Sequence, residues 1–435
     1  MRPSNRTKLG CTRRFRVRTS GLIFLVAFLI RGAILFSGMT PQQWIRPETN
    51  TEGGRVALTL YETGRYADPY VVPSGPTAHP LPLNTFLFAL LYEMFGFTLT
   101  AGYARCLLHI AAYSMMYALI PRLAERLGVG RRAGLIGGLA GALVPYQSSE
   151  EVIGWTSNEP LAAIALGLLL AALVRRWQAG RTTFANSLCI GLGFGIAFHF
   201  APALLVVWLG CLAFEVWWAR GRRSWSGPAA IVLGTILACA PWALRNYAAF
   251  GEWFFIRSNF GLELRMGNHE GATADIDAMD RREGPAQRHP GTNLAEARLV
   301  GELGEMEYMR RARQEALRWI ETHPAEFLRL TGLRFLHVWF GPWHLPNVPV
   351  LIAALTLLAA VGAWRVLPGM SMPRRAAVLL PPALFPLIYY VVAYMPRYRV
   401  PIDWILFMLA GAAIGPISSA DRHRGQSPPV GPGDG

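Results

Sequence analysis

The chain has 435 residues, 52% of them hydrophobic, and a formal net charge of +15 at pH 7. Long apolar runs recur along it, which excludes a single soluble core and predicts a polytopic membrane protein. Of its 42 basic residues all but Lys8 are arginine, so the body of the protein offers no lysine for Schiff-base chemistry. The basic excess falls mainly in short loops, a bias that reports membrane topology and does not indicate nucleic-acid binding.

Residues 1–20 form a basic N-terminal tail, and an apolar run over 21–38 follows it. A cleaved signal peptide has this pattern in isolation, but the many later apolar runs favour a retained first helix. The five cysteines are scattered without CxxC or His/Cys spacing. The sequence therefore predicts neither a disulfide framework nor a metal site.

The remaining apolar runs predict an all-α polytopic membrane protein, because lipid-exposed backbone must be hydrogen-bonded within its own segment. Several runs are shorter than the ~20 residues that a full crossing needs, so we expect about ten spans, within a range of nine to twelve. In chain order they lie near 21–38, 102–120, 133–147, 159–174, 187–200, 202–218, 229–245, 347–364, 376–394 and 401–416.

The placement of Leu83–Phe97 decides the topology. If this run crossed the membrane, the arginine-rich loop Arg122–Arg132 would lie outside, against the positive-inside bias. If it lies along the surface, this loop and the other basic loops are all cytoplasmic. We therefore predict a juxtamembrane helix at Leu83–Phe97 and a cytoplasmic N-terminus.

This topology divides the chain into five parts. A cytoplasmic tail (1–20) precedes an N-terminal membrane module (21–245), whose first outer loop is 39–101. An extracytoplasmic segment of roughly 100 residues (246–346) comes before the last three spans. It is predicted to be helical in its second half, with a charged amphipathic run over Glu296–Thr322 and a second helix opening at Pro324. C-terminal membrane helices (347–416) and a Gly/Pro/Ser-rich disordered tail (417–435) complete the chain.

Acidic residues on the outer side are candidates for a general base, which contributes ~10²–10⁴ in rate. Glu52 stands soon after the first span at the start of a helical pattern, and Glu48, Glu62 and Asp68 are weaker rivals. Glu159 opens a span in the second outer loop, where Glu150 and Glu151 are alternatives. A helix-capping role competes with a site role at these positions, because the helix dipole favours glutamate there.

Several cations are candidates for binding a phosphate group. Arg397 and Arg399 fill a short outer turn against the charge bias, so they need another reason to be there. Arg105 lies near the outer end of the second span, and His79 precedes the juxtamembrane helix. A fifth basic residue, Arg31, lies inside the first span, where it is costly unless it is paired or snorkels.

The stretch from Pro241 to Asn268 joins a membrane span to the long outer segment and is dense in hydrogen-bonding groups. Such a junction suits the recognition of a charged headgroup at the water boundary. Its candidates are Arg245, Asn246, Asn259 and Asn268.

With these residues in view, the chain resembles bacterial membrane glycosyltransferases of the C-type superfamily, most of all the family 39, protein O-mannosyltransferase-like branch. The resemblance runs from about Thr51 to Gly415. Its motifs occur in the order TEGGRVALTL, GPTAHPLPLNTFLFALLYEMFG, AGYARCLL, PWALRNYAAFGEWFFIRSNFGLELRMGN, WIETHPAEFLRLTGLRF and YMPRYRVPID.

The resemblance implies a hexosyltransferase of the plasma (inner) membrane with an extracytoplasmic active site. Its donor would be a polyprenyl-phosphate sugar held beside the bilayer, and its acceptor a glycan, lipid or protein. The family's first-loop acid falls on Glu52 and its second-loop acid on Glu159, while Arg397, Arg399, Arg245, His79 and Arg105 are candidates for the donor phosphate. No cofactor is implied with certainty, and a divalent cation stays open because some superfamily members use one.

Two departures from the family pattern bear on the geometry: the first-loop acid is glutamate where aspartate is usual, and His79 stands where some relatives have lysine. Two other functions fit a polytopic protein of this kind. A lipid or glycolipid flippase would explain Arg31 but would favour paired repeats, and none is found. A surface polysaccharide polymerase or ligase would also carry a large outer loop.

Overall fold

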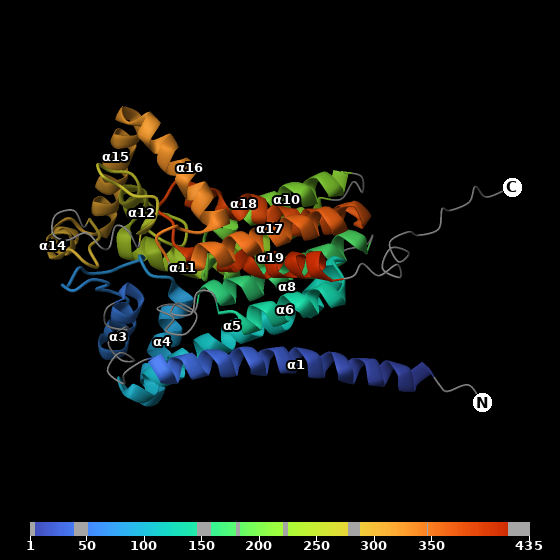
Figure 1. The fold of residues 1–435 in the computed structure, drawn as a ribbon. Helices are drawn as coiled ribbons and strands as arrows, with labels where there is room; N and C mark the ends of the chain where they lie inside the picture. The colour runs from blue at the N-terminus through green and yellow to red at the C-terminus, as the bar shows by residue number, and fades with distance from the viewer. Residues whose placement is uncertain are drawn as a thin grey trace.

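A computed structural model of the chain describes residues 5–38, 51–145, 158–179, 183–220, 225–276, 288–345 and 347–415. These residues form an all-α protein, as the sequence predicts, and the only β-pairing among them is two isolated bridges. Ten helices lie side by side as a bundle (Figure 1). They are α1 (Asn5–Gly38), α5 (Leu99–Leu127), α6 (Arg131–Leu143), α8 (Asn158–Gln178), α9 (Phe184–Phe198), α10 (Leu204–Arg220), α11 (Ser226–Phe250), α17 (Val348–Val366), α18 (Met372–Leu384) and α19 (Val400–Ile414).

Nine of the ten predicted spans fall mainly on one of these helices. The other, 376–394, is divided between α18, which ends at Leu384, and the 3₁₀ turn η3 (Phe385–Tyr390). Five helices in the described residues are long and apolar enough to cross a membrane: α1, α5, α8, α11 and α17 with its continuation to Gly369. The shorter helices α6, α9, α10, α18 and α19 pack against them, with α19 between α6 and α17 and with α9 along α11. That these shorter helices also cross stays a prediction.

Small residues allow the bundle helices to approach closely. A Cβ added to Gly137 of α6 would overlap the carbonyl of Phe407 in α19. One added to Gly191 of α9 would overlap the carbonyl of Ile231 in α11. The glycines of α6 and α9 therefore serve helix packing.

Arg31 is fully buried in α1. Its contacts offset the free-energy cost of placing a charge inside a span. Its guanidinium donates to the carbonyls of Gly141 and Ala142, at 3.0 Å each, and lies over the ring of Tyr117. These carbonyls belong to the last turn of α6, where a cation is favoured by the helix dipole. Arg31 thus ties α1 to the end of α6.

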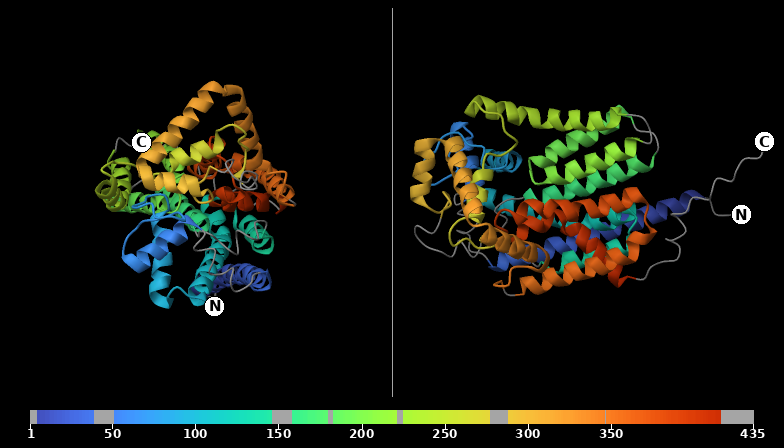
Figure 2. Two further views of the ribbon diagram at one scale, coloured as in Figure 1. Left: turned by 90° about the vertical axis from the view of Figure 1, so that its left-hand side faces the viewer. Right: turned by 90° about the horizontal axis from the view of Figure 1, so that it is seen from above.

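The remaining elements gather at one end of the bundle, on the left in Figure 1. They are α3 (Glu52–Thr63), α4 (Pro82–Phe95), α12 (Phe260–Gly267), α14 (Leu294–Leu303), α15 (Glu305–Thr322), α16 (Pro324–Phe340) and the 3₁₀ turns η3 (Phe385–Tyr390) and η4 (Pro396–Arg399); a further turn, η2 (Leu367–Gly369), follows α17. Helix α4 lies across the direction of the bundle (Figures 1 and 2), which is the arrangement predicted for a juxtamembrane helix. The predicted run Glu296–Thr322 is divided at Gly304, whose φ of 79° ends α14 and begins α15.

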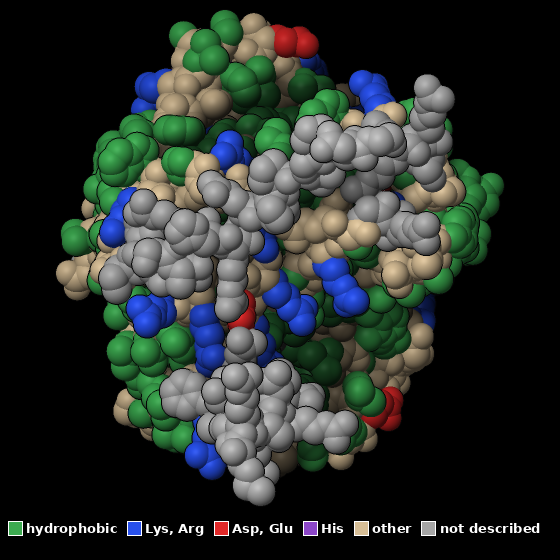
Figure 3. Space-filling model, turned by 90° about the vertical axis from the view of Figure 1, so that its right-hand side faces the viewer, with side chains coloured by type: hydrophobic (Ala, Val, Ile, Leu, Met, Phe, Trp, Pro, Cys, Tyr) green, Lys and Arg blue, Asp and Glu red, His purple; other side chains and the backbone are tan. Residues whose placement is uncertain are grey.

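The opposite end of the bundle is basic. Figure 3 shows Lys and Arg side chains distributed over that face with few acidic ones. Arginines in the last turns of α5, α8, α10 and α17 contribute to it: Arg126, Arg175, Arg220 and Arg365. This charge distribution agrees with the loops that the sequence assigns to the cytoplasm.

Candidate functional site

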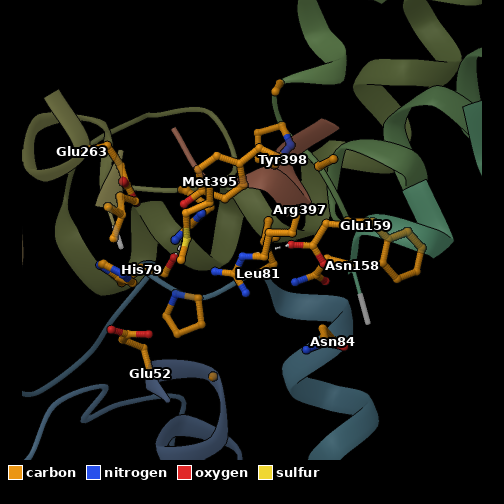
Figure 4. Close-up of a pocket in the computed structure, with 18 of the residues that line it drawn as sticks. Glu52, His79, Leu81, Asn84, Asn158, Glu159, Glu263, Met395, Arg397 and Tyr398 are labelled. Atoms are coloured by element: carbon orange, nitrogen blue, oxygen red, sulfur yellow. Dashed lines mark hydrogen bonds and ion pairs between the residues drawn. The ribbon is translucent and has the colours of Figure 1, made fainter. Parts of the chain in front are cut away.

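A cavity of about 330 Å³ lies at the end of the bundle where α3, α4, α8 and α12 meet. Side chains from segments far apart in the sequence project into it (Figure 4). Glu52 and His79 lie on one side of the cavity, and Glu159 with Arg397 on the other. Its polar lining includes Glu52, His79, Asn84, Asn158, Glu159, Arg257, Glu263, His289, Arg397 and Tyr398.

Glu52 is placed in the cavity by the start of α3. Thr51 caps this helix through a hydrogen bond from the amide of Gly54 to its hydroxyl, at 3.0 Å. The Glu52 carboxylate is partly exposed and accepts no hydrogen bond from the described residues. Its nearest polar partner there is Nδ1 of His289, at 3.7 Å, which is too far for a hydrogen bond. The carboxylate is therefore available for chemistry.

His79 is buried beside Glu52 and is held from two directions. Its Nδ1 is 3.1 Å from the hydroxyl of Tyr70, and its carbonyl accepts a hydrogen bond from Nε of Arg257. Burial lowers the pKa of His79 well below its ordinary value, with smaller contributions from Arg257 and His289. The ring is thus neutral near pH 7 and acts as a hydrogen-bonding or ligating group and not as a cation.

Glu305, the first residue of α15, fixes the backbone around His79, although sequence analysis gave it no role. Its buried carboxylate accepts hydrogen bonds from the hydroxyl of Thr77, the amide of Ala78 at 2.7 Å and the hydroxyl of Ser258 at 2.6 Å. Burial raises the pKa of Glu305, and these donors oppose that rise. One carboxylate therefore joins the segment before His79 to the segment that carries Arg257.

Glu159 and Arg397 face each other across the second side of the cavity. Glu159 lies in the first turn of α8, and Arg397 in η4, with 3.7 Å between Oε1 and Nε. The Arg397 guanidinium also lies 5.7 Å from the ring centre of Tyr398. This pair places a guanidinium, a group that binds phosphate through charge-assisted hydrogen bonds, beside a carboxylate at the cavity wall.

Three charged or ligating residues of the cavity were not predicted from the sequence: Arg257, Glu263 and His289. The guanidinium of Arg257 makes one hydrogen bond to the described residues, from Nε to His79, so its two terminal nitrogens are unpaired there. Glu263 accepts a hydrogen bond from the amide of Asn259 at 2.7 Å. Arg257 carried the same signal that singled out Arg397, because it is an arginine in a segment that the sequence predicts to be extracytoplasmic.

Three of the predicted phosphate-binding arginines lie outside the cavity lining. Arg245 donates to the carbonyls of Thr77 and Tyr66, at 2.7 and 2.9 Å. Arg399 is buried and bonded to Asp403 at 2.7 Å. Arg105 is also buried, and its guanidinium lies over the ring of Phe88. Their contacts are structural, because they join the outer loops and the bundle helices.

The predicted asparagines of the junction also make structural contacts. Asn246 is buried and bonded to Arg245 and to the carbonyl of Ile256. Asn268, which follows α12, donates to the carbonyl of Leu264 in that helix and to the carbonyl of Val391 after η3. Asn259 reaches the cavity only through Glu263. The predicted alternatives Glu48, Glu150 and Glu151 lie outside the described residues.

Three residues that could hold a metal ion meet in the cavity, although the sequence spacing predicted no such set. Donor atoms of Glu52, His79 and His289 all lie within 4.8 Å of one another. Neutral imidazole and carboxylate are both good ligands for a divalent transition metal. The three residues come from distant segments, and such a set has no spacing that could be recognised in the sequence.

No protein-family model and no curated protein matches this chain. Solved structures of an archaeal oligosaccharyltransferase from Archaeoglobus fulgidus are similar to it. The apo form is 14% identical, with a TM-score of 0.50 over 91% of this chain and 50% of that one. AglB with an inhibitory peptide and a dolichol-phosphate is 12% identical, with a TM-score of 0.47 over 92% and 50% of the two chains. A complex with Zn and sulfate is 15% identical, with a TM-score of 0.46 over 89% and 48%.

The chain spans about half the length of these proteins. The likeness to the apo form shows that the two proteins share a fold. The narrower resemblance to the family 39 branch stays a prediction.

Proposed function

We propose that this protein is a membrane glycosyltransferase that moves a hexose from a polyprenyl-phosphate donor to an acceptor hydroxyl. The observation that carries the proposal is the composition of one cavity, which holds the unbonded carboxylate of Glu52 and the guanidinium groups of Arg257 and Arg397. A carboxylate suits the activation of a hydroxyl, and guanidinium groups suit a phosphate. The fold shared with an oligosaccharyltransferase supports the same class.

The reaction that fits these groups is a single displacement. Glu52 removes the proton of the acceptor hydroxyl, whose oxygen forms a bond to the anomeric carbon of the sugar. The bond from that carbon to the phosphate oxygen breaks, and polyprenyl phosphate leaves with the electron pair. One displacement inverts the anomeric configuration.

The leaving phosphate gains negative charge in the transition state, so cations close to it stabilise that state more than the bound donor. Arg397 and Arg257 take this role, and Glu159 orients Arg397 through their contact at 3.7 Å. His79 contributes a neutral ring, because its pKa is held low by burial.

The cavity end of the bundle faces the outside of the plasma membrane in this proposal. The opposite end carries the arginines of the last turns of α5, α8, α10 and α17, and a basic end is retained in the cytoplasm. The donor's isoprenoid chain then lies in the bilayer while its phosphate and sugar reach the cavity.

Reconstituted vesicles containing the purified protein and a radiolabelled polyprenyl-phosphate hexose test the proposal. Covalent transfer of label to an acceptor, with release of polyprenyl phosphate, is the expected result. Movement of label across the bilayer without release would identify a flippase instead. Growth of a polymer from repeated lipid-linked units would identify a polymerase.

A further inference from the structure

The cavity contains a second set of convergent side chains whose chemistry differs from that of the arginines. Glu52 comes from the start of α3, His79 from the segment before α4, and His289 from the segment before α14. Their donor atoms lie within 4.8 Å of one another. The rings of His79 and His289 stand edge to face with centres 6.0 Å apart.

Hydrogen bonding among the described residues does not explain this convergence. The shortest contact of the Glu52 carboxylate is 3.7 Å, to Nδ1 of His289. A hydrogen bond would be near 2.9 Å. Nδ1 of His289 accepts its hydrogen bond from the amide of Gly291, at 3.0 Å, and a metal ion bound at Nδ1 would replace that bond.

His79 has the surroundings of a metal-bound histidine. It is 97% buried, with an exposed fraction of 3%, and its ring is kept in place by Tyr70 on Nδ1 at 3.1 Å. Its Nε2 has no hydrogen-bonding partner in the described part of the chain. A second group on one ring nitrogen, which orients the other nitrogen toward the ion, is the common support of a histidine ligand.

Gly291 leaves the space that the cluster needs. A Cβ added there would lie 2.7 Å from Oε1 of Glu52 and 2.9 Å from Nδ1 of His289. Both distances are closer than van der Waals contact, so a larger side chain would crowd the carboxylate and the imidazole together.

We propose that Glu52, His79 and His289 bind one divalent cation of the nitrogen-preferring kind, with Zn²⁺ or Co²⁺ as the representative ions. One carboxylate and two imidazoles give a three-ligand site that leaves a position open toward the cavity. Mg²⁺ prefers oxygen ligands and near-octahedral geometry, so this set disfavours it. Ligation through one oxygen of Glu52 leaves the other oxygen for the acceptor hydroxyl. Metal binding itself can be tested without a sugar donor, so its test does not depend on the transfer reaction proposed above.

The test is a titration of the tag-free, chelator-stripped full-length protein in detergent with Co²⁺, followed by visible absorption in the absence of any donor. We expect saturation at one equivalent, with the intense bands of a low-coordinate, nitrogen-ligated ion. Zn²⁺ should displace the Co²⁺, and a large excess of Mg²⁺ should not. Absence of saturable binding overturns the proposal, and it does so whether or not the protein transfers sugar.

Variants locate the ion. His289→Ala and His79→Ala are each expected to weaken Co²⁺ binding by at least about 10-fold, and Tyr70→Phe by about 10-fold through the lost support of His79. His323→Ala is the matched control, because this imidazole is exposed and stacked on Trp319 at the end of α15. If His79→Ala does not fold, His289→Ala decides, since that side chain is 22% exposed. Wild-type affinity in His289→Ala and Tyr70→Phe contradicts the assignment.

Discussion

Two glutamates at opposite ends of the bundle are bonded in opposite ways. Glu215 of α10 is buried and accepts hydrogen bonds from Nε and Nη2 of Arg176, at 3.0 and 2.7 Å, and from the indole of Trp177. Glu52 of α3 accepts none from the described residues. A carboxylate whose lone pairs are all occupied holds helices together, whereas one that is left unbonded beside a cavity can take a proton or a ligand.

The arginines differ in where their guanidinium groups lie. Arg245 and Arg399 direct theirs at carbonyls and at Asp403. Arg257 and Arg397 line the cavity. Residue type alone does not separate the two pairs of arginines, but their positions in the structure do. The following experiments test whether this separation corresponds to function.

Removing both cavity arginines should have the largest effect. The double variant Arg257→Ala/Arg397→Ala is expected to lower kcat/KM for the donor by roughly 10²–10⁴, because each charged hydrogen bond to phosphate contributes about 1.5–3 kcal/mol. Steady-state transfer at varied donor concentration measures this. Arg329→Ala is the control, since Arg329 is exposed and paired only with Glu326. Equal loss in the control would remove the cavity arginines from donor binding.

Breaking the structural pair should affect stability and leave catalysis alone. Glu215→Ala leaves the Arg176 guanidinium buried without its carboxylate, which costs about 3–5 kcal/mol. We expect a lower thermal unfolding midpoint in detergent and an unchanged transfer rate per folded molecule. A wild-type midpoint would show that the Arg176–Glu215 pair contributes little to stability. The assignment of a structural role to Glu215, in contrast to Glu52, would then be wrong.

The smallest effect concerns pH. The pKa of His79 is depressed in the folded protein, so below about pH 6.5 the unfolded chain takes up a proton that the native state does not. Stability at this site therefore falls as the pH is lowered, by up to about 1.4 kcal/mol per unit. Unfolding midpoints at pH 7.5 and 5.5, with chelator present, should differ less in His79→Asn than in the wild type. An equal difference in both would show that His79 titrates normally.

The sequence predicts the bundle well because a membrane helix is decided locally, by the length of its apolar run. Nine of the ten predicted spans fall mainly on one helix, and Arg31 donates to two carbonyls, as its position inside a span predicts. The division at Gly304 was not predicted, since a single glycine with positive φ interrupts an otherwise continuous pattern.

The site was predicted only in part. Glu52, His79, Glu159 and Arg397 line the cavity. They could be predicted because each stands next to a helix start that the sequence marks. His289 and Arg257 come from segments without periodicity, and their positions depend on distant contacts. The carboxylate of Glu305 is one such contact, because it joins Thr77 to Ser258. No local pattern reports a contact of this kind.

The most direct test of the account is a single-turnover measurement on purified protein with a radiolabelled polyprenyl-phosphate hexose, comparing wild type with Glu52→Gln. Glutamine keeps the shape of the side chain and removes its charge. The account predicts that the variant binds the donor normally but releases polyprenyl phosphate ~10²–10⁴ times more slowly. Release within a few-fold of the wild-type rate would show that the unbonded carboxylate at position 52 does not carry the reaction.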